Sequence, residues 1–380
     1  MDDAVPRVSD GAPVKRISTL LEPAGRVEGI PVRLAENQGI AYIGCYVLGM
    51  GFVITPDEAQ EWIAADPRNA EVLFPYLNGE DLNSRPDASA SRWVIDFNDR
   101  TEEEAKTYAL PYGRVLERVK PERARNNRKP RREHWWRFAE LATGLRATAA
   151  KLPEVLAIAR VSKTVMPMRV PTGQVMSEAC VVFASADFGD QAVLSSTAHQ
   201  LWAITYGSGM RNDPRYTPSD VFETFARPAA TSRLESVGRT LHSERQEIML
   251  RRNLGLTSLY NLVNDPAVDS GGDPDVARLR EIHVELDDSV MDAYGWPDID
   301  LQRGFHVFRQ VRRWTVGPAA RVEILDRLLE ENRRRRGWEG RGLEAKPGQT
   351  GLAGRAAEPD PVFGDVAPRY HCDATGRGND

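Results

Sequence analysis

Residues 112–138 read YGRVLERVKPERARNNRKPRREHWWRF, and the rest of the chain is organised around this stretch. From Arg114 to Arg137 it holds ten basic residues and three acidic ones. The whole protein has a net charge of −5, so the stretch is a local concentration of positive charge in an acidic chain. A segment of this kind either binds a polyanion or faces water.

The two tryptophans at the end of the stretch favour the first of these roles. Trp135 and Trp136 carry large rings that can stack on bases or on guanidinium planes. Arginine-rich segments beside aromatic residues are typical of nucleic-acid-binding surfaces. The alternative is a solvated surface loop above two buried tryptophans, and the two interpretations are compatible. The stretch therefore predicts an arginine-rich loop that contacts nucleic acid.

Composition limits the class of protein. A chain of 380 residues is long enough for two ordinary domains. The acidic net charge excludes a uniformly basic coat protein, so contact with nucleic acid is expected to be a focused patch. Cys45, Cys180 and Cys372 form no CxxC pair, which argues against a zinc site and fits a reducing compartment. The N-terminus lacks an apolar signal core and residues 40–54 are too short to span a bilayer, so we expect a cytoplasmic protein without membrane contact.

The first half of the chain predicts short strands and short helices. Alternating or β-branched apolar runs give the expected strands, which lie at residues 40–54, 92–97, 155–161, 165–170 and 175–184. Capping boxes predict helices after Thr55 and Thr101, and Ser196 is a further candidate helix cap. Residues 73–82 are dense in turn-forming residues.

From about Thr231 the apolar residues recur with the period of an amphipathic helix. The expected helices lie at residues 250–263, 273–294 and 318–336. The predicted fold class is α+β, a mixed and mostly antiparallel β domain followed by an α-helical domain and a disordered tail. The predicted segments are a linker or remnant of an upstream domain at 1–38, the β domain at 39–230, the helical domain at 231–338 and the tail at 339–380.

Two segments of the sequence match catalytic motifs only in part. Residues 212–216 read NDPRY, close to the [DN]PP[YF] loop of amino-methyltransferases. However, Arg215 replaces the second proline, and no glycine-rich turn for an adenosyl cofactor precedes it. Residues 86–87 with Glu104 and Lys106 could be arranged as a PD-ExK nuclease, but a helix-like stretch does not bring carboxylates together around Mg²⁺. We therefore predict no catalytic, cofactor-binding or metal-binding residue in this chain.

Several sequence segments, in this order along the chain, resemble segments of a known protein family. They are GMGFVITPDEAQEW (49–62), PYLNGEDL (75–82), WVIDF (93–97), VKPERARNN and WWRF (within 119–138), SKTVMPMRVP (162–171), VLSSTAHQLWA (193–203) and RYTPSDVFETFARP (215–228). Together they resemble the target-recognition domain of type IIG, MmeI-like restriction–modification proteins and related adenine-specific DNA methyltransferases. Residues 256–266, 279–296 and 320–336 resemble the helical region that follows this domain.

The resemblance covers roughly residues 37–336 and implies the recognition part without the catalytic part. S-adenosylmethionine is then expected on a separately encoded methyltransferase or methyltransferase–nuclease subunit, or the chain is a truncated remnant. The implied function is sequence-specific recognition of double-stranded DNA for adenine-N6 methylation, in restriction–modification and phage defence.

The resemblance also assigns roles to residues. Cations of the arginine-rich stretch are expected to contact phosphates, and they are Arg123, Arg125, Arg128, Lys129, Arg131 and Arg132. Trp135 is expected to stack beside them, and Lys163 and Arg169 to contact the DNA backbone or base edges. The base contacts are expected from donors suited to guanine or adenine edges, namely Arg211, Asn212 and Arg215. Ser195, Ser196, His199 and Trp202 are expected to form a helix cap and packed core.

The sequence leaves two other functions open. The first is a complete enzyme with a divergent methyltransferase site around Asp213 and Tyr216, which binding of S-adenosylmethionine by the isolated chain would favour. The second is an interaction subunit of a phage-defence complex, whose basic stretch binds an acidic protein or RNA. Competition between duplex DNA and RNA would distinguish this second function.

Overall fold

The computed structural model of the protein describes residues 8–9, 12–13, 25–27, 29–162, 164–210, 213–268, 271–308 and 311–344. In these residues the elements enclose two hydrophobic cores, a larger one and a smaller one. No helix in this described part is long and apolar enough to cross a membrane.

The larger core is built on a four-stranded antiparallel sheet. Its order is β3 (Ala41–Ile43), β10 (Cys180–Phe183), β7 (Glu154–Ala159) and β8 (Met168–Pro171). Every residue of β10 is buried, as expected for a strand that is covered on both faces. Buried side chains of α8 (Phe188–Ser195) and α9 (Thr197–Tyr206) belong to the same core. The sheet therefore lies inside this part of the molecule.

The smaller core contains the aromatic residues of the arginine-rich stretch. Its sheet has the order β4 (Val53–Ile54), β6 (Arg92–Ile95), β5 (Leu73–Leu77) and β9 (Val175–Met176), with β9 parallel to β5. Helices α1 (Pro56–Ala65), α3 (Glu102–Lys106) and α4 (Ala109–Arg118) contribute buried residues. Strands β9 and β10 follow one another in the chain but belong to different sheets, which ties the two cores together.

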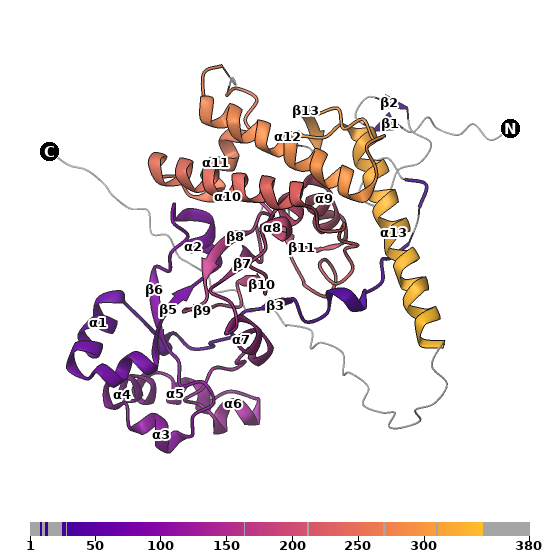
Figure 1. Cartoon of the computed structure of the whole chain (residues 1–380). Coiled ribbons are helices and arrows are strands. Elements are labelled where there is room, and N and C mark those ends of the chain that lie inside the picture. Colours follow the sequence, from indigo (N-terminus) through magenta and orange to yellow (C-terminus); the bar gives the residue numbers. More distant parts are fainter. Residues whose placement is uncertain are drawn as a thin grey trace. The chain divides into compact units, whose positions relative to one another are not determined.

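The C-terminal helices complete the larger core. They are α10 (Ser232–Arg252), α11 (Leu256–Val263), α12 (Pro274–Tyr294) and α13 (Pro318–Glu344). Helix α10 packs against α8 and α12 (Figure 1). Gly238 allows this approach, because a Cβ atom there would lie 1.9 Å from the carbonyl oxygen of Phe188. The predicted domain boundary at residue 230 therefore falls inside one continuous core.

Local signals in the sequence predict several elements correctly. Thr55 and Thr101 form complete capping boxes at α1 and α3, and Ser196 caps α9. The turn-dense segment 73–82 instead forms β5 and α2 (Gly79–Ser84). The Asn78 side chain explains the difference, because its Oδ1 accepts hydrogen bonds from two backbone N–H groups of α2 and starts a helix.

Three further features differ from the expected elements. The expected helix at 250–263 is broken at Asn253, which adopts a left-handed conformation with φ 50° and ends α10. A hairpin of β13 (Gly304–Phe308) and β14 (Val311–Thr315) was not expected. Within the predicted linker, Leu34 is buried and the Asn37 amide donates to the carbonyl oxygens of Phe222 and Phe225. Helix α13 continues to residue 344, and the predicted tail beyond it lies outside the described residues.

Candidate nucleic-acid interface

The arginine-rich stretch folds as three short helices, so the prediction of a loop is wrong. Helix α4 is followed by α5 (Lys120–Ala124) and α6 (Lys129–Glu133), and the three pack in succession (Figure 1). Pro121 and Pro130 each lie in the first turn of a helix, where a missing N–H costs no hydrogen bond. The stretch therefore presents its cations from a fixed backbone.

Burial corrects the prediction for Arg123. Its side chain is 1% exposed, and its guanidinium donates to the carbonyl oxygens of Leu48 (2.9 Å), Val47 (2.9 Å) and Arg137 (3.3 Å). Burial lowers the pKa of Arg123 to about 10, so the group is still protonated at neutral pH. Arg123 holds the backbone of residues 47–48 in place and is removed from the predicted phosphate contacts.

Burial also corrects the prediction for Trp135. Both tryptophan rings are buried, and they meet edge to face with 6.0 Å between their centroids. The Lys120 ammonium lies 4.8 Å from the centroid of Trp135, and the Trp136 Nε1 donates to the Arg100 carbonyl oxygen at 3.0 Å. Neither ring is available to stack on a base. The structure therefore confirms the alternative interpretation for the two tryptophans, in which both are buried beneath charged residues.

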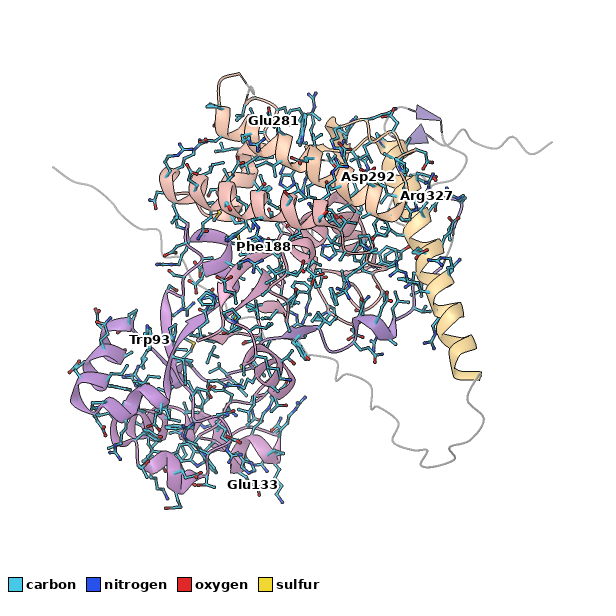
Figure 2. The ribbon with its side chains drawn as sticks, viewed as in Figure 1. Trp93, Glu133, Phe188, Glu281, Asp292 and Arg327 are labelled. Atoms are coloured by element: carbon cyan, nitrogen blue, oxygen red, sulfur yellow. The ribbon has the colours of Figure 1, made fainter. Side chains whose placement is uncertain are left out.

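Six cations of the same stretch are exposed, and we call this group the basic face. They are Arg118, Lys120, Arg125, Arg128, Lys129 and Arg132. Within the described part of the chain, no acidic partner is found for Arg118, Arg125 or Arg128. Glu117, Glu122 and Glu133 are the exposed acids of the same segment, and Glu133 lies at the outer edge of α6, 3.7 Å from Lys129 (Figure 2). The basic face therefore keeps a net positive charge.

Arg131 connects the basic face to a second group of charges. It is half-buried, lies 5.3 Å from the centroid of the Tyr46 ring and is 3.5 Å from the Glu140 carboxylate. Tyr46 and Glu140 also exchange both of their backbone hydrogen bonds. One residue earlier, the Cys45 carbonyl oxygen accepts from the N–H of Glu178. Arg131 and Glu178 are thus joined through two neighbouring residues of one strand-like segment.

Glu178 and Arg160 continue this line of charges. The Arg160 N–H donates to the Ala179 carbonyl oxygen at 2.8 Å. Burial raises the pKa of the Glu178 carboxyl. The positive charge of the nearby Arg160 acts to lower this pKa, and the negative charge of Glu140 acts to raise it further. The Glu178 Oε2 atom is buried without a hydrogen-bond partner. An unpaired buried carboxylate oxygen costs free energy.

The hairpin of β11 (Ser208–Met210) and β12 (Asp213–Arg215) follows next. The Tyr216 N–H donates to the Arg160 carbonyl oxygen at 2.7 Å, and Arg215 pairs with Val161. We call the resulting series the charged strip, made of Arg131, Glu140, Glu178, Arg160 and Arg215. Sequence reasoning missed Arg160 and Glu178, although an acid inside the apolar run VMSEACVVFA (175–184) was an available signal.

The remaining predicted contacts divide into two groups. Lys163, Arg211 and Asn212 lie outside the described residues. Arg169 is described, and its side chain is 3% exposed. Its guanidinium lies 3.9 Å from the centroid of Phe188 and donates to the Ala186 carbonyl oxygen at 2.9 Å. Arg169 is therefore a packing residue of the larger core, which corrects its predicted contact with DNA.

The residues expected to be architectural have that role. His199 is fully buried, its Nε2 lies 2.9 Å from the Tyr216 hydroxyl, and burial lowers its pKa to about 4. The Ser196 hydroxyl accepts the N–H of His199 as the α9 cap, and the Trp202 Nε1 donates to Thr224. Because Tyr216 is buried against His199, its ring cannot stack on a flipped base. The alternative of a methyltransferase site at residues 213–216 loses its aromatic residue.

The residues of the PD-ExK-like motif also lack the arrangement that a nuclease needs. Glu104 closes the capping box of α3, and the Lys106 ammonium is 2.6 Å from the Glu103 carboxylate. Over the described ranges, no group of three histidine, cysteine, aspartate or glutamate residues could hold a metal ion. Glu104 and Lys106 are thus helix-capping and surface residues.

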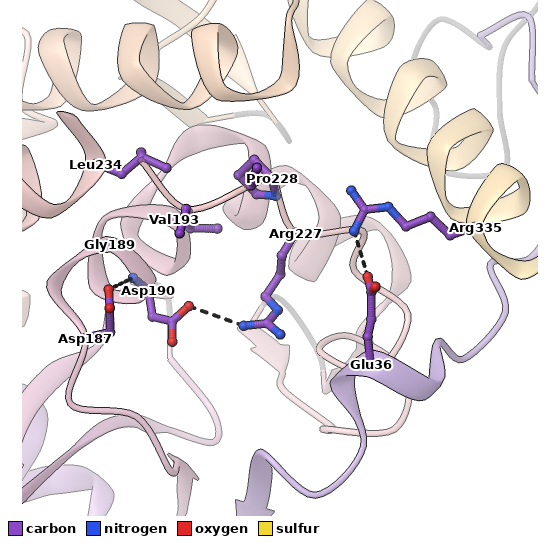
Figure 3. Close-up of a pocket in the computed structure, with 11 residues that line it drawn as sticks. Glu36, Asp187, Gly189, Asp190, Val193, Arg227, Pro228, Leu234 and Arg335 are labelled. Carbon is purple, nitrogen blue, oxygen red and sulfur yellow. Dashed lines mark hydrogen bonds and ion pairs between the residues drawn. The ribbon is translucent and has the colours of Figure 1, made fainter. Parts of the chain in front are cut away.

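A pocket of about 540 Å³ lies where η1 (Ala35–Asn37), α8, α10 and α13 meet (Figure 3). Its two guanidiniums are already neutralised, because Arg227 pairs with Asp190 at 3.2 Å and Arg335 pairs with Glu36 at 2.6 Å. None of its lining residues belongs to the basic face or the charged strip. The pocket is therefore not an additional anion site for the interface.

Comparison with known proteins relates this surface to a family. A family model described as the target recognition domain of MmeI matches residues 44–229. These residues are therefore similar to the target recognition domain of MmeI. The matched segment contains all of the basic face and all of the charged strip, together with every strand of both sheets except β3.

A solved structure extends the likeness beyond the target recognition domain. It is described as the type IIL restriction–modification enzyme MmeI in complex with DNA, and it matches with a TM-score of 0.61 and 19% sequence identity. The match covers 86% of this chain and 39% of that chain, so this protein spans about two-fifths of that enzyme's length. The shared fold therefore includes C-terminal helices that follow residue 229. Comparison with curated protein sequences finds no match.

Proposed function

We propose that this protein recognises a specific sequence in double-stranded DNA. The observation that carries the proposal is the match of residues 44–229 to a target recognition domain. A net positive, solvent-exposed face within the same residues supports it, as does the fold shared with an enzyme solved in complex with DNA. The proposed contacts divide into those that hold the phosphates and those that read the bases.

The basic face is the proposed phosphate contact. Arg125, Arg128, Lys129 and Arg132 extend from α6 and the turn before it, and Arg131 stands at the border with the charged strip. Phosphate contacts release counterions, so each one adds about −0.9 to the slope of log affinity against log salt concentration. These contacts fix the position of the domain on the duplex and carry no sequence information themselves.

The charged strip is the proposed base contact. Arginine recognises the O6 and N7 acceptors of guanine, and a carboxylate accepts a hydrogen bond from the amino group of cytosine. Arg160 and Arg215 can act in the first way, and the partly exposed Glu178 in the second. Arg211, Asn212 and Lys163 remain proposed contacts because of their positions in the sequence beside the same elements.

We further propose that recognition serves an adenine-N6 methyltransferase of a type IIG-like restriction–modification system in phage defence. In this proposal, a catalytic part on a partner subunit binds S-adenosylmethionine and transfers the methyl group. Supporting this division, Tyr216 is buried and the NDPRY segment departs from the catalytic loop motif. Equilibrium dialysis of the purified chain with S-adenosylmethionine is expected to show no binding.

A gel-shift titration tests DNA recognition. The chain is mixed with a duplex of random sequence over a series of salt concentrations, and the bound duplexes are then recovered and sequenced. We expect affinity that falls linearly with log salt, together with enrichment of one short sequence among the bound duplexes. Duplex RNA of the same length serves as a competitor. Failure to bind DNA at low ionic strength, or equal binding of RNA, would overturn the proposal.

A further inference from the structure

Met50 is the most exposed methionine for which the structure describes a side chain. It is 70% exposed at the start of η2 (Met50–Phe52). The other methionines with described side chains are buried, and they are Met166, Met168, Met176, Met249 and Met291. Single exposed apolar side chains are common on protein surfaces, so the exposure of Met50 alone does not identify a partner, and the turn that presents it has to be considered.

The backbone that presents Met50 is held in an unusual conformation. Leu48 has a left-handed conformation with φ 48°, and Gly49 follows with φ 134°. A left-handed leucine is strained and persists only where its surroundings enforce it. Arg123 enforces it, because the buried guanidinium binds the carbonyl oxygens of both Val47 and Leu48. The strain and the buried cation therefore serve to fix one turn.

The other side of the turn is fixed by close packing. A Cβ atom on Gly51 would lie 2.7 Å from both the Arg118 Cβ and the Val119 Cγ2 atoms. Only glycine allows the turn to rest against the junction of α4 and α5 at this distance. Phe52 is fully buried, and its ring meets Phe138 edge to face at 5.4 Å. Met50 thus projects from a rigid turn and not from a flexible loop.

The turn lies between the two parts of the proposed interface. Residues 45–50 begin beside Glu178, pass Arg131 at Tyr46 and reach Arg118 at Gly51. Five residues span at most about 17 to 18 Å, which is roughly five base pairs of duplex at about 3.4 Å each. The turn that carries Met50 therefore lies within this distance of residues that belong to the charged strip and to the basic face.

We propose that Met50 is an apolar wedge that inserts against the base stack of the bound DNA. The proposal rests on the proposed function and deepens it. Proteins that deform DNA insert apolar side chains, methionine among them, between base steps and partly unstack them. DNA is the expected partner because Arg118, an exposed cation, packs against the turn at Gly51. The Glu122 carboxylate also adjoins the turn, since a Cβ atom on Gly49 would lie 3.6 Å from its Oε2.

A topoisomerase relaxation assay tests the wedge. A closed circular plasmid is relaxed in the presence of the full chain, and the linking number is measured after the protein is removed. We expect the unchanged protein to shift the linking number and Met50→Ala to lose most of this shift at equal DNA occupancy. Met50→Leu keeps an apolar wedge and should retain it. Leu116→Ala, which removes another exposed apolar side chain of the same region, is the matched control and should retain it too.

The outcomes separate the wedge from the proposed function. Salt-dependent binding without any shift in linking number would overturn the wedge and leave DNA recognition standing. A full shift with Met50→Ala would overturn it as well. Absence of DNA binding by the unchanged chain would overturn the proposed function and the wedge together. Circular dichroism of each variant checks that the fold is retained.

Discussion

Two arginine-rich segments of this protein look alike in sequence and differ in the structure. Residues 114–137 carry the basic face, and residues 333–336 are four consecutive arginines in α13. In α13, Arg334 and Arg335 both pair with Glu331, and Arg335 also pairs with Glu36. In the basic face, Arg118, Arg125 and Arg128 have no acidic partner among the described residues. A count of arginines therefore does not identify a surface that can bind a polyanion.

The helix lengths explain this difference. Helix α13 is continuous, so Glu331 lies three and four residues before Arg334 and Arg335, where side chains meet on one face. The stretch 114–137 is divided into three short helices. Among its residues, all of which the structure describes, only Lys129 and Glu133 form an ion pair at a spacing of three or four residues. Breaks in the helix thus leave cations available to an external anion.

Acid pH should separate the cores that support the two segments. Helix α13 packs on the larger core, which contains the buried His199 and His283. Burial lowers the pKa of His199 to about 4 and that of His283 to about 3. Both values lie below the unfolded value of about 6.5, so the unfolded chain binds more protons below that pH and stability falls as pH falls.

Well below pH 6.5 the expected loss approaches about 1.4 kcal/mol per pH unit for each histidine, which gives about 3 kcal/mol for both between pH 6.5 and 5. Urea unfolding at a series of pH values measures it, and hydrogen exchange should show the loss first in α9 and α12. No buried histidine is found in the described residues of the smaller core, which provides the internal comparison. A flat stability profile across this range would contradict the prediction.

Replacing Arg123, the buried cation of the arginine-rich stretch, should lower the stability of the fold. Arg123→Ala leaves the carbonyl oxygens of Val47, Leu48 and Arg137 without their donor, and we expect a loss of about 3 kcal/mol in the free energy of unfolding. Arg123→Lys should not restore it, because one ammonium cannot reproduce the guanidinium fork. Urea unfolding measures both. Arg125→Ala, two residues away and exposed, is the control and should leave the midpoint unchanged.

Removing exposed cations should distinguish the two arginine-rich segments directly. The triple variant Arg125→Ala, Arg128→Ala and Arg132→Ala should weaken the slope of log affinity against log salt by about 2.7 units, with roughly a 100-fold loss of affinity at low salt. Gel shifts on a duplex of random sequence measure it. The matched variant Arg334→Ala with Arg336→Ala should retain the slope. Equal effects of the two variants would show that the basic face is not a distinct surface.

The smallest expected effect concerns base choice. Glu178→Ala should reduce discrimination at one base pair of the selected sequence by about 2 kcal/mol, because one base contact is lost. The salt slope should stay as it is, since Glu178 contacts no phosphate in this proposal. Sequencing of duplexes selected by the variant measures the change. Selection of an unaltered sequence would remove Glu178 from the base contacts.

The sequence by itself determined the features whose causes lie within a few residues. Thr55, Thr101 and Ser196 cap helices because each side chain binds an N–H group three residues ahead. The periodic apolar residues of α12 and α13 similarly indicate helices without reference to the rest of the fold. The family resemblance also located the target recognition domain, because its motifs are continuous segments in a fixed order.

Only the tertiary structure decided which of these residues can meet DNA. Arg123 and Arg125 are two residues apart in the same stretch, yet one is 1% exposed and bound to Leu48, 75 residues away, while the other is exposed. Arg160 and Glu178 become part of an interface only because the chain brings Cys45, Ala179 and Tyr216 beside them. Exposure and pairing arise from contacts between distant segments. Local sequence patterns do not contain those contacts.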